Sequence, residues 1–167
     1  MNMESFLAWW AAGIGKLISP QLSVFLVSIL PIIEERGGLI LSRMLNLPLN
    51  EALIWCILGN ILPIPFVLLG LQKLLHFLDD HHMSKIAEWL VAKAEKNKPK
   101  IDKYGFWGLA LFVGIPLPGT GAWTGALVAS VFDMDRKKAS VSIVIGVLLA
   151  ALIMSIVSYG LLGSLLG

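Results

Sequence analysis

The chain has 167 residues, of which 57% are hydrophobic and 14% are charged, and its formal net charge is +2. Soluble globular domains carry about 25% charged residues, so this composition excludes an ordinary soluble domain and predicts an all-helical integral membrane protein. The single cysteine, Cys56, excludes a disulfide within the chain.

Residues 1–18 are predicted to form a helix that lies at the membrane interface. Trp9 and Trp10 are followed closely by Lys16, and tryptophan and lysine are typical of the boundary between lipid and water. Glu4 stands where a signal peptide would carry positive charge, so we expect the segment to be retained. A steeply inserted first helix is the alternative that the sequence leaves open.

Residues 19–72 are predicted to form a hairpin and then a helix that spans the membrane. The charged tip of the hairpin comprises Pro31, Glu34, Glu35, Arg36, Gly37 and Gly38. The apolar stretch that follows the tip is too short to cross a hydrocarbon core of about 30 Å, so the chain would return to the side from which it came. A solvent loop between two membrane segments is the alternative interpretation.

The spanning helix of this first half is predicted over residues 53–71, an uncharged stretch of 19 residues. At ~1.5 Å per residue its length would be about 28 Å, which matches the hydrocarbon core. Asn60 lies in its middle, where a polar side chain indicates a contact between helices or, alternatively, a contact with substrate. In the lysine-rich residues 73–103 we expect an amphipathic helix on the membrane surface, broken at the sequence KNKPKIDK.

Residues 104–167 are predicted to repeat this plan of hairpin and spanning helix. The uncharged stretch 104–132 cannot form one continuous helix, because prolines and glycines cluster in its middle. Broken backbone at membrane depth is tolerated where it is buried in protein or lines a wet cavity, so we expect a re-entrant hairpin. Its tip and the start of its returning arm contain Pro116, Pro118, Gly119, Thr120, Gly121, Trp123 and Gly125. The uncharged residues 140–167 form the second predicted spanning helix.

A shift of 87 residues aligns the two halves without a gap. Matched positions include Pro31 with Pro118, Gly38 with Gly125 and Gly59 with Gly146. Because a hairpin returns to its own side and the next helix crosses, the second copy would have the opposite orientation, as in transporters with inverted repeats. Most lysines and arginines lie in residues 73–103 or 136–138, and the positive-inside rule places these residues in the cytoplasm.

The sequences PIIEERGG at the first tip and PLPGTGAWTGA at the second resemble the bacterial and archaeal family of small multidrug export proteins, over nearly the whole chain. That family is similar to the DedA superfamily, whose members have two facing re-entrant hairpins and are associated with proton-driven movement of lipid phosphates. The resemblance implies a protein of the bacterial or archaeal cell membrane. Glu34 matches the acidic residue of the first DedA hairpin, and Pro118-Gly119 matches the proline-glycine of the second. DedA proteins usually carry an arginine shortly after that pair, whereas residues 120–122 of this chain are threonine, glycine and alanine.

These features together predict a small multi-pass transporter or lipid flippase, and not an enzyme. We expect one of the adjacent carboxylates Glu34 and Glu35 to carry a proton, because poor solvation raises the pKa of a carboxyl group toward the physiological range. Glu34 is preferred because it matches the DedA position.

The substrate is predicted to be an amphiphile with an anionic group, such as a lipid phosphate, held between the two tips. The returning arms are expected to begin near residues 36–38 and 121–123, and their free N–H groups would bind the anion. Arg36 would add a fixed positive charge, Thr120 a hydroxyl group, and Trp123 an apolar cover. If Arg36 only neutralises the two carboxylates, the alternative is efflux of lipophilic cationic drugs.

A second alternative belongs to another class, namely a non-transporting membrane scaffold or assembly factor. In either case the expected partners are membrane lipids, a small amphiphilic or lipid substrate for the transporter, and a second copy of the chain in a homodimer. We expect no cofactor, no metal ion and no nucleic acid.

Overall fold

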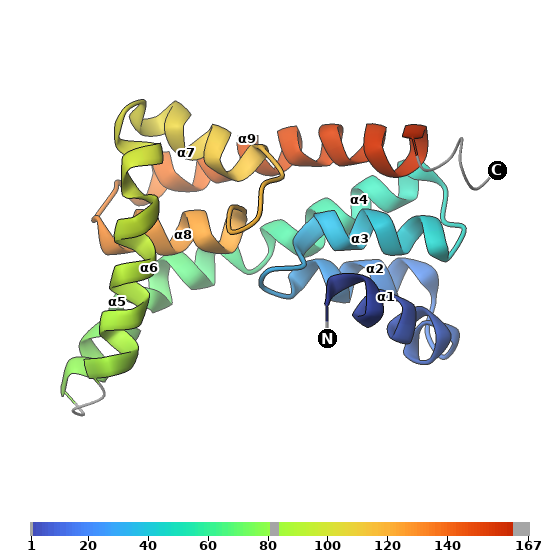
Figure 1. Cartoon of the computed structure of the whole chain (residues 1–167), viewed down its shortest axis with the longest axis horizontal. Helices are drawn as coiled ribbons and strands as arrows, with labels where there is room; N and C mark the ends of the chain where they lie inside the picture. The colour runs from blue at the N-terminus through green and yellow to red at the C-terminus, as the bar shows by residue number, and fades with distance from the viewer. Residues whose placement is uncertain (1, 81–83, 162–167) are drawn as a thin grey trace. The chain divides into compact units, whose positions relative to one another are not determined.

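The computed structural model describes residues 2–80 and 84–161, and all regular elements in these residues are helices (Figure 1). Contacts between residues divide the chain into two compact units. Unit 1 contains Met1–Leu62 and Val147–Gly167, and unit 2 contains Pro63–Gly146. The units do not follow the predicted repeats, because unit 1 includes the end of the last long helix.

Unit 1 begins with α1 (Met3–Ala12), a short 3-10 helix (Ile14–Lys16) and α2 (Pro20–Ile29). The side chains of Asn2 and Ser19 cap α1 and α2, because each accepts a hydrogen bond from the backbone N–H three residues further on. Pro20 occupies the first position of α2, where its missing N–H has no cost. Leu7 of α1 is buried in the core of the unit, so the N-terminal segment packs against protein.

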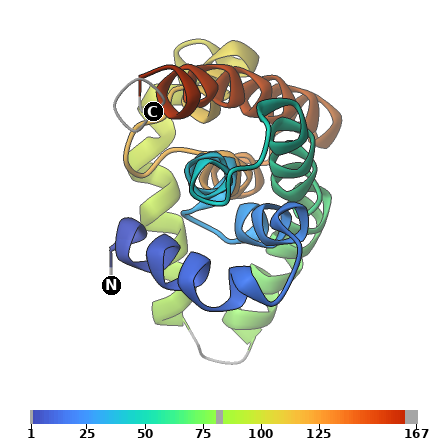
Figure 2. The same ribbon diagram turned by 90° about the vertical axis from the view of Figure 1, so that its right-hand side faces the viewer.

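The central helix of unit 1 is α3 (Glu34–Met44). It is surrounded by α1, α2, α4 (Leu49–Ile61) and the π-helical turn Ile156–Leu161 that follows α9 (Figure 2). α2 and α3 are the arms of the first hairpin, and the chain turns between them at residues 30–33. Because α3 has neighbours on several sides, its polar residues Glu34, Glu35 and Ser42 are buried.

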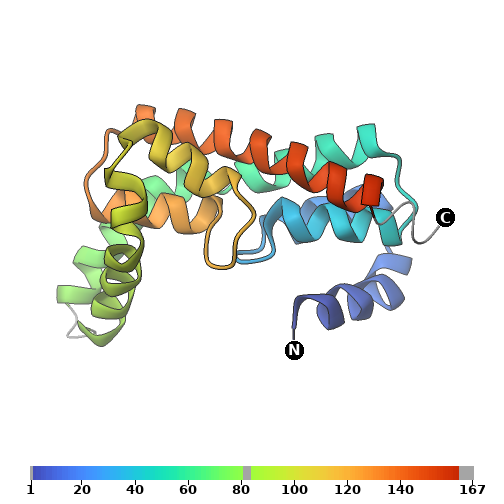
Figure 3. The same cartoon turned by 45° about the horizontal axis from the view of Figure 1, so that its top comes forward.

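Unit 2 contains α5 (Ile64–Asp80), α6 (Ser84–Asp102), α7 (Gly105–Gly114), α8 (Ala122–Val131) and the first part of α9 (Arg136–Ser155). α7 and α8 are the arms of the second hairpin, and the loop between them forms its tip (Figure 3). α5 packs against α8, and α6 packs against both arms.

The lysine-rich residues 73–103 differ from their prediction in two respects. α5 continues into this segment and ends at Asp80, and α6 continues through Pro99 instead of breaking there. The face of α6 that carries Ala94 and Ile101 is buried, and the helix packs against α7 and α8. This packing offsets the cost of a proline inside a helix, which is about 3 kcal/mol.

Within residues 2–80 and 84–161, two helices are long and apolar enough to cross a membrane. Leu49–Gly70 has 22 residues, with an interruption at Leu62 and Pro63, and Arg136–Gly160 has 25 residues. At ~1.5 Å per residue they are about 33 and about 37 Å long, which exceeds a hydrocarbon core of about 30 Å. The second helix begins before residue 140, where it was predicted, because the Asp135 side chain accepts a backbone N–H from its first turn.

The connectors between each returning arm and the next long helix have the same local structure at an offset of 87 residues. Asn46 and Asp133 both have a positive φ, 54° and 51°. The next residues, Leu47 and Met134, each donate their backbone N–H to the carbonyl five residues earlier. The matched connectors of the sequence therefore fold alike in the two halves.

The first arms follow a different offset. A Cβ added to Gly59 would meet the carbonyl oxygen of Phe25, and a Cβ added to Gly146 would meet the carbonyl oxygen of Ala110. The long helices thus correspond at an offset of 87 and the first arms at an offset of 85, so the gapless alignment is wrong in the first arm. The second tip is longer than the first, and this accommodates the difference.

Candidate functional site

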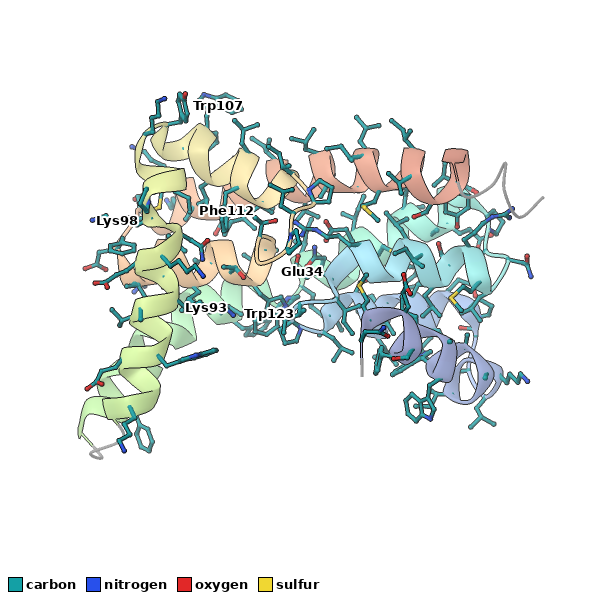
Figure 4. The ribbon with its side chains drawn as sticks, viewed as in Figure 1. Glu34, Lys93, Lys98, Trp107, Phe112 and Trp123 are labelled. Carbon is teal, nitrogen blue, oxygen red and sulfur yellow. The ribbon has the colours of Figure 1, made fainter. Side chains whose placement is uncertain are left out.

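The first candidate site lies at the start of α3, where the first hairpin returns. α3 begins at Glu34, whereas the sequence placed the start of the returning arm at residues 36–38. Its first turn therefore holds two acidic residues, which stabilise the positive end of the helix dipole. Glu34 is 2% exposed and Glu35 is 1% exposed. The predicted charged tip is thus a buried acidic pair at a helix N-terminus, and Figure 4 labels Glu34, its first member.

The turn before this acidic pair is exposed, and its backbone is unusual. Pro31 and Ile32 are exposed, and the φ values of Ile32 and Glu34 are 77° and 54°. Left-handed backbone is rare for a β-branched residue such as isoleucine. Gly37 is required one turn further on, because a Cβ there would collide with the side chain of Ile33.

Glu35 faces the interior of unit 1. Its Oε2 atom is buried and has no hydrogen-bond partner among the described residues. One turn further along α3, a Cβ on Gly38 would collide with the Ser28 hydroxyl and approach the Cys56 thiol. Glu35 is therefore surrounded by α2 and α4 and not by solvent.

Burial has a direct consequence for the proton affinity of Glu35, which lies outside both long apolar helices. Burial first, and then the neighbouring charge of Glu34, raise the pKa of Glu35 from 4.5 to about 8. Arg36 acts in the opposite direction. Arg36 is half-buried, and both Glu34 and Arg36 have interaction partners.

Asn60 lies at the level of the first tip because α2 and α4 run parallel. The Gln21 side chain donates a hydrogen bond to Glu51 near the start of both helices, and the rings of Phe25 and Trp55 pack one turn further on. These two contacts pair residues of α2 and α4 at nearly the same offset along the chain. The C-terminal end of α4, which carries Asn60, therefore lies beside the C-terminal end of α2. Asn60 is fully buried, and neither polar atom of its amide has a hydrogen-bond partner among the described residues.

Four residues therefore form what we term the buried polar cluster: Ser28, Glu35, Cys56 and Asn60. Glu35 and Asn60 are each one helical turn from the contact between Gly38, Ser28 and Cys56, on the side toward the tip. An unsatisfied buried polar group costs about 1–3 kcal/mol. Such groups call for a water molecule, an ion or a catalytic or transport role. The buried Oε2 atom of Glu35 and the buried amide of Asn60 are therefore candidates for such a role.

The second tip is held by its own hydrogen bonds. The Thr120 hydroxyl lies 2.9 Å from the carbonyl oxygen of Ile115 and 2.8 Å from that of Leu117, to which it donates. Gly119 and Gly121 have φ values of 79° and 126°, which glycine adopts without strain. Thr120 therefore stabilises the loop through its hydroxyl group.

The start of α8 packs against protein. Trp123 is half-buried and, with Ala122 of the same turn, borders a small hollow against Pro63 and Ile64. A Cβ on Gly125 would collide with the Val113 side chain of α7, so this glycine permits close packing of the two arms. Pro116 and Pro118 shape the loop, and Pro118 is exposed.

The structure thus places Glu34, Glu35, Arg36 and Asn60 in unit 1, and it places Thr120 and Trp123 in unit 2. The sequence did not single out Ser28 or Cys56. The spacing of four residues between Cys56 and Asn60, which puts both on one face of a helix, could have indicated the thiol.

The helices and the buried acidic pair define a class of protein, namely a small protein whose described residues form helices, two of them of membrane-spanning length. The chain belongs to the family described as "Putative small multi-drug export protein", whose model matches residues 34–153. The matched residues begin at the acidic pair and include Asn60 and the whole second tip. No curated protein and no solved structure matches the chain. The family description and the two apolar helices indicate a membrane protein of an export family.

Proposed function

We propose that the chain is a small proton-coupled exporter in which Glu35 takes up and releases a proton in each transport cycle. The observation that carries this proposal is the carboxylate of Glu35, which is 1% exposed and has a buried oxygen without a hydrogen-bond partner among the described residues. A carboxylate buried within a membrane protein is costly and marks a candidate functional residue. Glu35 replaces Glu34 as the preferred carrier, because its Oε2 atom is buried without a hydrogen-bond partner among the described residues.

The groups around Glu35 allow both protonation states. Glu34 and Arg36 lie on the same helix, and their charges have opposite effects on the pKa of Glu35. Cys56 faces it from α4, α2 carries no charged residue, and Glu4 of α1 is exposed. A pKa of about 8 lies close to physiological pH, so a modest change in solvation during transport would load or release the proton.

For the substrate we propose an amphiphile with an anionic group, in line with the likeness of the two tips to DedA proteins. The first turn of α8 at the second tip contains no acidic residue, so the positive end of its helix dipole is not offset by a carboxylate and favours an anion nearby. The first tip does not have this property, because Glu34 and Glu35 occupy the start of α3. A lipophilic cation is the competing substrate, and the excess of acidic groups over Arg36 at the first tip favours it.

We also propose an inverted arrangement in the membrane of a bacterial or archaeal cell. The two hairpins would be re-entrant, and residues 73–103 and the start of α9 at Arg136 would lie on the cytoplasmic side. The support is the lysine and arginine content of these segments and the common fold of the two connectors.

The test is transport by the purified protein in liposomes with an imposed pH gradient. A fluorescent polyprenyl phosphate and a fluorescent lipophilic cation serve as the two substrates. We expect gradient-dependent movement of the phosphate by wild type, loss of movement in Glu35→Gln, and wild-type movement in Glu4→Gln, an exposed control. If only the cation moves, the substrate is a lipophilic cation and not an anionic amphiphile. Equal transport rates in wild type and Glu35→Gln would exclude Glu35 as the proton carrier.

A non-transporting scaffold is the second candidate function, and a feature of α6 favours it. Trp89 is 61% exposed, and the ammonium group of Lys93 lies 5.2 Å from the centre of its ring. A lysine-rich helix with an exposed tryptophan suits an anionic lipid surface. If neither substrate moves in liposomes, while α6 still binds anionic vesicles, the scaffold function is supported instead.

A further inference from the structure

A groove of about 210 Å³ lies along α7 and the second tip, within unit 2. The lining of the groove includes Tyr104, the residue before α7, and Leu111 and Phe112 of α7. It also includes Ile115, Leu117 and Thr120 of the tip. Leu111 and Leu117 are 44% and 56% exposed, so the groove is open on one side. The hydroxyl of Thr120 is used by two carbonyl oxygens of the tip. The walls of the groove are therefore apolar.

A lysine, Lys103, lies next to one end of this groove. Tyr104, which lines the groove, is also the residue before α7, and the ammonium group of Lys103 lies 5.2 Å from the centre of its ring. α7 begins without a side-chain cap, so the positive end of its dipole adds to the charge of Lys103. Trp107, one turn along, is 61% exposed and projects outward from α7 (Figure 4).

Lysine, tyrosine and tryptophan together are typical of the level at which lipid headgroups meet the hydrocarbon core. From that level the groove extends along α7, a helix of 10 residues, toward the tip. At ~1.5 Å per residue this is about 15 Å of helix. The groove thus connects the position of Lys103, at the expected headgroup level, with apolar side chains along α7 and the tip.

We propose that this groove binds an anionic membrane lipid, with the lipid phosphate at Lys103 and the start of α7 and one hydrocarbon chain along Leu111 and the tip. The charge at Lys103 selects an anion, and the apolar walls select a molecule with a hydrocarbon chain over a free phosphate. If a methylene group occupies about the 30 Å³ of a water molecule, the groove has room for roughly seven. The site goes beyond the proposed transport and does not depend on it.

The experiment is native mass spectrometry of the purified, delipidated protein with added lipids. The probes are phosphatidylglycerol, phosphatidylcholine with the same chains, diacylglycerol and inorganic phosphate. We expect phosphatidylglycerol to bind in preference to all three other probes. Lys103→Gln should lower the preference over phosphatidylcholine about fivefold, since one lysine at the surface contributes about 1 kcal/mol to attraction of an anionic lipid.

A groove-filling variant tests the position of the chain. In Leu111→Trp we expect bound phosphatidylglycerol to fall about tenfold, as for the loss of about two buried methylene groups. Leu117→Trp fills the end of the groove at the tip. It replaces Leu111→Trp as the test variant if Leu111→Trp does not fold. The matched controls are Lys85→Gln on the exposed part of α6 and Leu152→Trp on α9, where leucine is 61% exposed. Both controls should bind as wild type does.

Three results would overturn the site: equal binding of phosphatidylglycerol and phosphatidylcholine, tight binding of inorganic phosphate alone, or losses in the two controls as large as in the groove variants. The same measurement on Glu35→Gln separates this site from the proposed transport. Lipid binding by that variant should equal wild type, even though its transport is lost.

Discussion

Replacing Glu35 by glutamine should remove a large pH dependence of stability. The pKa of Glu35 is 4.5 in an exposed chain and about 8 in the fold, so the folded protein holds this proton more tightly than the unfolded chain does. Between these two values the unfolded state has lost the proton and the folded state has kept it. The free energy of unfolding therefore falls as the pH rises from about 4.5 to about 8, and no further loss from this group occurs above pH 8.

The size of the effect follows from the same two values. At about 1.4 kcal/mol per pH unit, the difference between 4.5 and about 8 amounts to about 5 kcal/mol. Glutamine keeps the shape of the side chain without the charge. Above pH 8, Glu35→Gln should thus be more stable than wild type, with a melting temperature higher by on the order of 10 °C. At low pH, where Glu35 is protonated in both states, the two proteins should melt alike.

The assay is thermal unfolding in detergent, followed by tryptophan fluorescence from about pH 5 to about pH 9. Glu4→Gln on α1 is the matched control, because Glu4 is exposed. Its melting curve should follow wild type at every pH. A wild-type melting temperature that stays level or rises over this range, together with no gain in Glu35→Gln at high pH, would refute the reasoning that burial determines the protonation of Glu35.

Two further predictions concern packing and topology. Gly146→Ala should destabilise the fold by about 1–3 kcal/mol, measured by the same thermal unfolding, because its Cβ would overpack the first arm of the second hairpin. Gly70→Ala, where a Cβ meets nothing within 4 Å, should be neutral or slightly stabilising. Single cysteines at Lys103 and at Asp133, in a Cys56→Ala background, should both react with an impermeant maleimide added to the cytoplasmic side. Labelling from opposite sides would exclude a re-entrant second hairpin.

The acidic pair changes the expectation for the two tips. The sequence predicted an anion site at the start of each returning arm, with Arg36 as the fixed charge. Because α3 begins at Glu34, its first turn already contains two carboxylates that interact with the dipole. The start of α8 contains none. The two tips are therefore chemically different, although their connectors are alike.

Composition and local pattern determined the class of the protein and most of its elements. An apolar run of sufficient length becomes a helix because every backbone group must find a partner within the chain when water is absent. The cluster of Pro116, Pro118, Gly119 and Gly121 marked the second tip for the same local reason. The matched connectors around Asn46 and Asp133 also rest on short-range hydrogen bonds, so the sequence was sufficient to indicate them.

Tertiary packing alone decided the environment of each polar side chain. The local sequence around Glu34, Glu35 and Arg36 predicted a charged tip. Glu34 and Glu35 are buried because α3 packs among several neighbouring helices. Ser28 and Cys56 lie close to each other because α2, α3 and α4 approach closely at Gly38. This contact joins residues that are far apart in the sequence. Pro99 remains helical because α6 packs on α7 and α8. Burial is a property of several segments at once, and a local pattern cannot specify it.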